Sequence, residues 1–208
     1  MGAEMTRPAR RWNGQTQDQR QAERRRLLIL SAVRLYGAQG YRSTGVRAVC
    51  RDAGLTERYF YESFANSEEL LLATFEEVVA FTRAQMVGVD DPALPAETRV
   101  RSMLVAYFAT LAADPTGARV FLVEVVGVHP LLDAAFEQSL EQLSQPLIDA
   151  WDPEGRGPLS TDPLLRRAVV GGLLHIALAW GAEGYARPVD SVVDAALILC
   201  RLAAPPQR

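Results

Sequence analysis

The stretch from Thr44 to Leu70 constrains the fold more than any other part of the chain, because it has the pattern of two short helices joined by a tight turn. Val46, Val49 and Cys50 form an apolar stripe at the i, i+3, i+4 spacing of one helix face. Gly54 then interrupts this pattern and supplies the backbone freedom that a sharp turn needs. A short helix with one buried side, ended by a turn, is therefore expected here.

The second helix of this stretch is expected to begin after Thr56, whose hydroxyl is a good N-cap. Phe60 and Phe64 lie four residues apart and are expected to face inward. The outer face then carries polar side chains, namely Glu57, Arg58, Tyr61 and Glu62. A helix, a turn with glycine and a second helix with a polar outer face predict a helix-turn-helix, whose second helix fits the DNA major groove.

The same residues resemble the DNA-binding domain of the tetracycline-repressor (TetR) family. The resemblance is dense over about residues 25 to 72, and beyond residue 75 it is one of helical pattern and length only. The residues that carry it are Gly40, Tyr41, Thr44, Val46, Val49, Ala53, Gly54, Leu55, Thr56, Tyr61, Phe64, Glu68, Glu69 and Leu70. The resemblance implies a dimeric all-α repressor with an N-terminal reading head and a C-terminal ligand pocket.

Length and helical periodicity predict an all-α protein of about nine helices. A chain of 208 residues with 49% apolar and 23% charged residues is ordinary for a globular protein. We expect a flexible basic arm over residues 1–19, a three-helix helix-turn-helix domain over 20–66 and a helical ligand-binding and dimerisation domain over 67–208. The expected helices after the head cover about 67–87, 96–113, 118–127, 130–151, 168–181 and 189–202.

Charge is distributed unevenly along the chain. All 22 basic residues are arginine, and 12 of them lie in residues 1–66 beside 6 acidic residues, which gives a local balance of +6. Residues 67–208 hold 10 arginines and 19 acidic residues, a balance of −9. Codon usage can explain the choice of arginine but not this asymmetry. A basic head on an acidic body predicts that the head alone meets a polyanion such as double-stranded DNA.

Within the head, residue positions predict separate roles in DNA binding. Arg58, Tyr59 and Glu57 stand at the start of the recognition helix, where side chains reach base edges; the alternative for Tyr59 is partial burial against the first helix. A phosphate is expected near Arg24, Arg25, Arg26 and Tyr61, and a phosphate or a base near Arg47. Thr44 is expected to cap the first helix of the motif and to touch the DNA backbone. Thr56 and Ser67 complete the set at the starts of the next two helices, where backbone N–H groups at Ser67 are expected to contact a phosphate. Ser67 is also expected to cap the fourth helix, at a position where the TetR family often has lysine.

A small-molecule site is predicted among the helices of the C-terminal domain. The candidates form a mostly apolar set with few polar groups, which is the usual composition of such a site: Tyr107, Phe108, Phe121, Glu124, Phe136, His175 and Trp180. Each of them is also a plausible core residue. Glu124 on an apolar segment needs a partner, and it either orients a ligand or pairs with an arginine such as Arg119 or Arg166.

The last two expected helices are apolar on more than one face, which favours a subunit interface. The residues expected there are Gly171, Leu173, Leu174, Val193, Leu197 and Cys200. The TetR resemblance likewise implies a four-helix interface from the last two helices of each subunit. A run of about fourteen residues between Ala168 and Gly181 is too short to cross a membrane, so no membrane partner is expected. The apolar faces and the resemblance together predict a C2 homodimer, and a cytoplasmic location is expected for it.

Catalysis is not predicted. The chain has two histidines, His129 and His175, and lacks the HExxH, GxSxG, Walker and GxGxxG patterns. No spacing of histidine and cysteine predicts a metal site or another cofactor. Cys50 and Cys200 are expected to be buried, reduced thiols.

Together these observations predict a homodimeric repressor that a small, mostly apolar ligand releases from a palindromic operator. A DNA-binding activator or a ligand-independent regulator is the first alternative. A protein-interaction module that has lost DNA binding is the second, and Arg58, Tyr61 and Phe64 argue against it.

Overall fold

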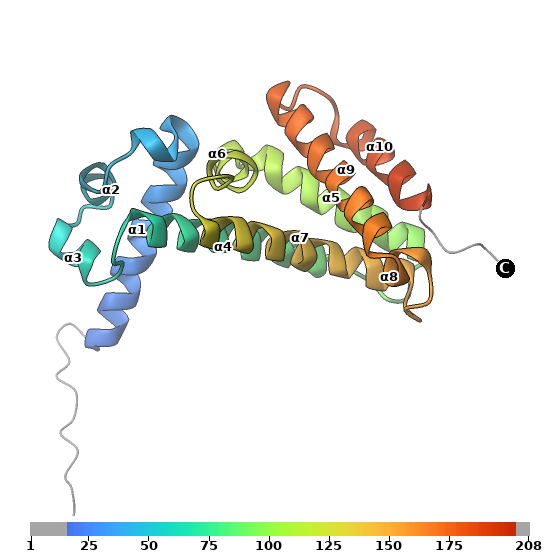
Figure 1. The fold of residues 1–208 in the computed structure, drawn as a ribbon, viewed down its shortest axis with the longest axis horizontal. Helices are drawn as coiled ribbons and strands as arrows, with labels where there is room; N and C mark the ends of the chain where they lie inside the picture. The colour runs from blue at the N-terminus through green and yellow to red at the C-terminus, as the bar shows by residue number, and fades with distance from the viewer. Residues whose placement is uncertain (1–15, 203–208) are drawn as a thin grey trace, which may run out of the picture.

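The computed structural model describes residues 16–202, which form two groups of helices joined by one long helix (Figure 1). No strand occurs in this range. The elements are α1 (Gln17–Gln39), η1 (Tyr41–Ser43), α2 (Val46–Asp52), α3 (Glu57–Tyr61), α4 (Ser67–Gly88), α5 (Ala96–Ala113), α6 (Pro115–Arg119), η2 (Val120–Glu124), α7 (Pro130–Trp151), α8 (Pro158–Thr161), α9 (Pro163–Ala182) and α10 (Val189–Leu202). The predicted all-α fold with an N-terminal helix-turn-helix is confirmed. Most of the predicted basic arm lies outside the described residues.

The head consists of α1 to α3 around a small apolar core. Leu28, Tyr36, Val49, Phe60 and Phe64 are almost completely buried, so both short helices are fixed to one side of α1. The inward orientation predicted for the two phenylalanines is confirmed.

Helix α1 begins three residues earlier than predicted, at Gln17. Thr16 accepts a hydrogen bond from the Gln19 backbone N–H at 3.2 Å, and the Gln19 side chain accepts one from the Thr16 N–H at 2.8 Å. This reciprocal capping box satisfies two backbone donors at the helix end. Residues 17–19 therefore belong to α1 and not to the predicted arm.

Helix α4 connects the head to the body (Figure 1). Its N-cap is Asn66, whose side chain accepts from the Glu69 N–H at 2.8 Å, and not Ser67 as predicted. Leu70 and Phe75 are buried near the head, and Met86 is buried at the far end among the body helices. One continuous helix therefore contributes to both cores.

The body is a bundle in which α4, α5 and α7 pack against one another, and α10 packs on α5 and α9. The apolar residues expected on the inner face of the helix over 96–113, which is α5, are all buried, and α7 has the predicted bounds: the α5 residues are Val100, Met103, Leu104, Tyr107, Phe108 and Leu111. Residues 114–117, which lie between two of the expected helices, are instead the start of α6, because Asp114 caps it and Pro115 occupies its first position. The segment predicted as a helix over 118–127 divides into the end of α6, the π turn η2 and a non-helical turn.

Head and body meet where α1 lies against α6. A Cβ atom built on Gly37 of α1 would come within 2.3 Å of the backbone oxygen of Thr116, so only glycine permits this approach. Gly40, at the end of α1, has a positive φ of 87° and directs the chain into η1.

Helix α9 is longer than predicted because Asp162 caps it and Pro163 begins it. It has 20 residues, and its most apolar 18-residue window has a mean hydropathy of 1.3. By length and composition alone it is long enough to cross a membrane, which corrects the estimate made from fourteen residues. Only 17% of that window is buried inside the protomer.

Candidate DNA-reading surface and ligand cavity

The outer face of the helix-turn-helix presents exposed polar side chains. The side chains of Arg58 and Arg47 are 83% and 87% exposed, and Tyr61 is 61% exposed although its ring packs edge-on against Phe60 at 5.1 Å. Glu57 stands beside them on the first turn of α3. The buried phenylalanine holds the helix, and its polar residues remain available to a groove.

Both arginines of this face have acidic partners in the isolated protein. The Nε atom of Arg47 donates to Glu57 at 2.8 Å, and that of Arg58 donates to Glu62 at 3.1 Å. Such exposed pairs contribute little to stability, about 0–1 kcal/mol. They orient the guanidinium groups and can exchange their carboxylates for phosphate or base acceptors.

The arginines near the start of α1 do more than was predicted for them. The Arg24 guanidinium lies 4.4 Å above the Tyr59 ring and 3.5 Å from a Glu62 carboxylate oxygen, and the Arg25 guanidinium lies 4.9 Å above the Phe64 ring. Arg26 pairs with Glu23 at 3.6 Å on the surface of α1. Tyr59 is half-buried, in agreement with the alternative noted for it. Arg24 therefore packs against α3, and Arg25 packs against Phe64 in the segment that follows it.

Three predicted polar contacts need correction. Thr44 is buried and donates its hydroxyl to the Gly40 carbonyl at 2.8 Å, so it neither caps α2, whose N-cap is Gly45, nor reaches a phosphate. Thr56 occupies the N-cap position of α3, but its hydroxyl makes no capping hydrogen bond. The hydroxyl of Ser67 pairs with that of Tyr41 at 3.1 Å and so fixes the start of α4.

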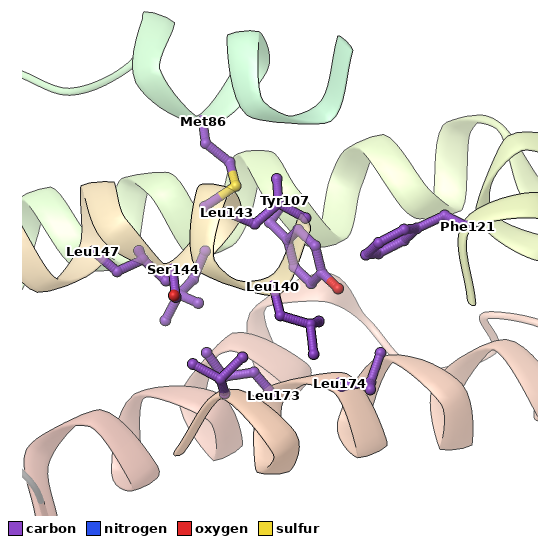
Figure 2. A pocket seen from close by; sticks show the side chains of 11 residues that line it. Met86, Tyr107, Phe121, Leu140, Leu143, Ser144, Leu147, Leu173 and Leu174 are labelled. Carbon is purple, nitrogen blue, oxygen red and sulfur yellow. The ribbon is translucent and has the colours of Figure 1, made fainter. Parts of the chain in front are cut away.

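A narrow cavity in the body, with a volume of about 30 Å³, lies between α4, α5, α7 and α9 and is partly open to solvent (Figure 2). Tyr107 and Ser144 provide the hydroxyl groups of an otherwise hydrocarbon lining. Burial raises the pKa of Tyr107, which therefore stays a neutral phenol. The full lining is Met86, Leu104, Tyr107, Phe121, Leu140, Leu143, Ser144, Leu147, Val170, Leu173 and Leu174. The site therefore suits an apolar molecule with at most one or two polar atoms at this depth.

Two further spaces share lining residues with the cavity. Ser144, Leu147, Val170 and Leu173 also line a second apolar space of about 20 Å³ near α8 and α10. Ser144 and Val170 further border an open groove between α7 and α9, whose rim carries Arg166, Arg167, Glu137 and Glu141. An apolar interior thus opens at a charged rim.

Of the residues predicted to bind a ligand, Tyr107 and Phe121 line the cavity and the other five do not. Phe136 supports Phe121 from behind at 6.3 Å, and Phe108 packs edge-on against Trp180 at 5.9 Å in the core. His175 is on the surface of α9, where its Nδ1 lies 2.8 Å from the Gly171 carbonyl oxygen. Phe108 and Trp180 are as buried as Phe121, so position in the body, and neither residue type nor burial alone, separates these groups.

Glu124 pairs with Arg119 at 2.9 Å, which was the alternative to a ligand contact. Its second oxygen accepts a hydrogen bond from the head, at the Tyr41 N–H.

The prediction missed most aliphatic residues of the cavity wall. Leu140, Leu143, Ser144 and Leu147 lie at successive i, i+3, i+4 positions on α7, so helical spacing could have grouped them on one face. No local pattern distinguishes a wall that meets empty space from one that meets another side chain.

The residues predicted for a dimer interface divide into two groups. Leu173, Val193, Leu197 and Cys200 are buried inside the protomer, which corrects their assignment to an outer face. Leu174 lines the cavity, and both Leu174 and Gly171 are half-buried. The outward apolar residues are others: Leu164 is 78% exposed and Ile198 is 54% exposed, and Ala168, Ala179 and Ala195 are also exposed.

A helix-turn-helix head on a helical body with an internal apolar cavity defines the class of a transcription regulator. Residues 28–74 match the family model described as bacterial regulatory proteins, tetR family, so the head is a tetR-family DNA-binding domain. The resemblance inferred from the sequence motifs is confirmed.

The whole described chain also has the fold of solved regulators of this kind. It is similar to the fatty acid degradation regulator FadR from Bacillus halodurans, at 23% identity and a TM-score of 0.68, over 85% of this chain and 93% of that one. It is similar to FadR from Bacillus subtilis in complex with stearoyl-CoA, at 19% identity and a TM-score of 0.71, over 88% and 99%. A tetR-family regulatory protein from Rhodococcus RHA1 matches at 18% identity and a TM-score of 0.68, over 89% and 99%.

Proposed function

We propose that this protein is a cytoplasmic homodimeric repressor that leaves its operator when a mostly apolar small molecule enters the body cavity. One observation carries the proposal: α4 contributes Ser67 to the contact with the head and Met86 to the cavity wall. A ligand that displaces the far end of α4 therefore acts on the helix that holds the reading head.

Long-chain acyl thioesters are the ligand class that we propose. The lining is apolar apart from two hydroxyl groups, a second apolar space adjoins it, and the rim of the groove carries Arg167 and an Arg166 that pairs with Glu141 at 3.5 Å, beside Glu137. An acyl chain suits the interior, and the anionic part of a thioester suits the rim. The fold is shared with a FadR solved with stearoyl-CoA, which supports this choice of probe.

The outward face of α9 and α10 supports the proposed dimer. Helix α9 is apolar over 20 residues, yet only 17% of its most apolar window is buried within the chain, so its outer face is expected to pack against another surface. A second copy of the chain related by a twofold axis supplies an identical apolar face. Such a dimer presents two reading heads, so a palindromic operator follows.

The test begins with selection of genomic fragments by the purified protein, which yields the operator. Stearoyl-CoA is then titrated into the protein–operator complex, with coenzyme A alone as the control. Release by the acyl thioester and not by coenzyme A supports a ligand-released repressor. Tighter binding supports a corepressor-dependent regulator, an unchanged affinity supports a ligand-independent one, and failure to select any fragment contradicts DNA binding.

A further inference from the structure

Glu124 forms a direct polar link between body and head. Its Oε2 accepts a hydrogen bond from the Tyr41 backbone N–H at 2.7 Å, and its Oε1 accepts one from the Arg119 Nε at 2.9 Å. The two linked residues are 83 positions apart in the sequence. The Glu124 side chain is only 10% exposed, so water competes little for these bonds.

The backbone before Tyr41 lies next to the Arg119 and Glu124 side chains. Tyr41 directly follows Gly40, which has a positive φ, and a Cβ atom at Gly40 would lie 3.5 Å from both the Arg119 guanidinium and the Glu124 carboxylate. The N–H donates to a carboxylate, and such charge-assisted bonds are shorter and stronger than those between neutral groups. A displacement of the Glu124 carboxylate must therefore either move the Tyr41 backbone or break the bond.

On the body side, the link belongs to the wall of the cavity. Glu124 is the last residue of η2, a single π turn that also contains Phe121. Phe121 lines the cavity and packs against Phe75 of α4 at 6.0 Å. Isolated π turns are rare and occur often at functional sites. A molecule that pushes on Phe121 acts on the turn that carries Glu124.

On the head side, the link reaches the support of the recognition helix. Tyr41 begins η1, its ring packs edge-on against Tyr36 of α1 at 5.3 Å, and its hydroxyl pairs with Ser67. The Thr44 N–H donates to the Tyr41 carbonyl at 3.0 Å, and α2 begins two residues later. Tyr41 is therefore fixed to α1, to α4 and to the segment that leads into the helix-turn-helix.

We infer that Glu124 is a positioning residue that couples the state of the cavity to the reading head through its hydrogen bond with the Tyr41 N–H. This inference rests on the proposed function, since it assigns the cavity to a ligand and the head to DNA. It adds a specific route, which runs from Phe121 through the π turn to Glu124, Tyr41 and the start of α2.

The first test needs neither ligand nor DNA. Ser144→Leu fills part of the cavity, and Leu140→Trp is a second filling variant in case the first fails to fold. The readout is hydrogen exchange of the Ser43 and Thr44 amides, which have their own acceptors in the head. In the otherwise native protein we expect filling to change these exchange rates by at least fivefold.

The same filling is then repeated in two backgrounds of nearly equal side-chain size. Glu124→Gln keeps an oxygen that accepts from the Tyr41 N–H, so the fivefold response should persist. Glu124→Met has no such acceptor, so the response should fall below twofold, and Glu124→Ala repeats this test with a smaller side chain. Glu154→Ala, which removes an exposed pair with Arg156 in the loop after α7, is the matched control and should keep the full response.

The inference is overturned by an equal response in the Glu124→Met and native backgrounds, or by the absence of any response to filling in the native background.

A second experiment separates the inference from the proposed function. Stearoyl-CoA should weaken operator binding by the native protein at least tenfold and that by Glu124→Met less than threefold, with unchanged affinity for stearoyl-CoA itself. If stearoyl-CoA does not bind the native protein, the proposed ligand class is wrong, and the exchange experiment still decides the role of Glu124.

Discussion

At the scale of single residues, the reading surface is defined by cations that already have acidic neighbours. The Arg58 and Arg47 side chains are exposed, and each donates from its Nε to a glutamate, Glu62 or Glu57, so the terminal N–H groups of the guanidinium remain for other acceptors. In the proposed complex these groups donate to DNA, and a duplex with acceptors at matching positions is favoured. Discrimination then depends on the arginine that reaches a base edge.

We expect Arg58→Ala to weaken binding to the selected operator by about 1–3 kcal/mol and to relax the preference at one base pair of each half-site, because a bidentate contact to guanine is lost. A randomised half-site library with quantitative selection measures both effects. Arg187→Ala is a matched control, since Arg187 also forms an exposed pair with a glutamate four residues away, but in the body. An unchanged sequence preference in Arg58→Ala would remove Arg58 from the base-reading set.

We expect Tyr61→Phe to weaken binding to every duplex by about 0.5–1.5 kcal/mol, because the exposed hydroxyl is lost while the ring stays packed on Phe60. The same library measures this loss. If the variant instead changes the preferred bases, the hydroxyl reads sequence, and our orientation of α3 in the groove is wrong.

At the scale of elements, the sequence predicted the helices best where burial alternates regularly. The inward face of α5 and both ends of α7 agree with the structure because apolar spacing and a prolyl start coincide there. Helices α6 and α9 begin with Asp114-Pro115 and Asp162-Pro163, where aspartate caps the helix and proline fills its first turn. The expected helices left both Asp-Pro pairs between them, and this accounts for the misplaced starts.

The site was less predictable than the helices. Exposure of the recognition helix followed from local pattern, but the placement of His175 and Glu124 depends on how α9 and η2 lie in the folded body. Local sequence does not encode that arrangement. The long-range bond from Tyr41 to Glu124 has no counterpart in any nearby motif.

The turn between α7 and α8 depends on a buried carboxylate. The hydrogen bond from the Ser160 hydroxyl, together with those from the Gly157 and Arg156 N–H groups, holds the pKa of Asp152 below its usual value. A lowered pKa in the folded state contributes stability above the unfolded-state value of about 3.9, and this contribution is lost as the pH falls through the folded-state pKa.

We therefore expect Asp152→Ala to lower the free energy of unfolding by about 1–3 kcal/mol at pH 7, because donors in the turn lose their acceptor. The difference from the native protein should shrink as the pH falls through the lowered folded-state pKa of Asp152. Urea unfolding at several pH values measures it. A difference that is constant with pH would show that the charge of Asp152 is not what stabilises the turn.

The outer face of α10 can be tested with two neighbouring residues. Ile198 is 54% exposed and Leu197 is 1% exposed. We expect Ile198→Glu to give a folded, soluble monomer by light scattering and circular dichroism, because the charge falls on the proposed interface. Leu197→Glu places the charge in the protomer core and should instead unfold the chain. A stable Ile198→Glu dimer would locate the subunit contact elsewhere; attachment of either protein to lipid vesicles would point to a membrane.

At the scale of the whole molecule, basic and acidic residues are distributed unevenly between the N-terminal part and the rest of the chain. Residues 1–66 have a balance of +6 and residues 67–208 one of −9, so an approaching duplex is attracted to the N-terminal part and repelled by the rest. This asymmetry orients the encounter before any specific contact forms.

We expect the logarithm of the DNA-binding constant to fall linearly with the logarithm of salt concentration. Arg47→Ala should make this slope shallower by about 0.9 for each phosphate contact that is lost. Fluorescence anisotropy between low and physiological salt measures the slope. Arg83→Ala, in the body half of α4, should leave it unchanged; an unchanged slope for Arg47→Ala would mean that Arg47 contacts no phosphate.

The buried thiols have a chemical consequence for the proposed ligand. Acyl thioesters are themselves acylating agents, which transfer the acyl group most readily to thiolates and unprotonated amines. Burial raises the pKa of Cys200 to about 11 and also raises that of Cys50, so both stay protonated thiols at neutral pH. The sequence has no lysine, because all 22 of its basic residues are arginine, and so no lysine side chain offers an amine to the thioester. A regulator built in this way can hold a reactive thioester and return it intact, so that its signal is reversible and leaves no covalent trace on the protein.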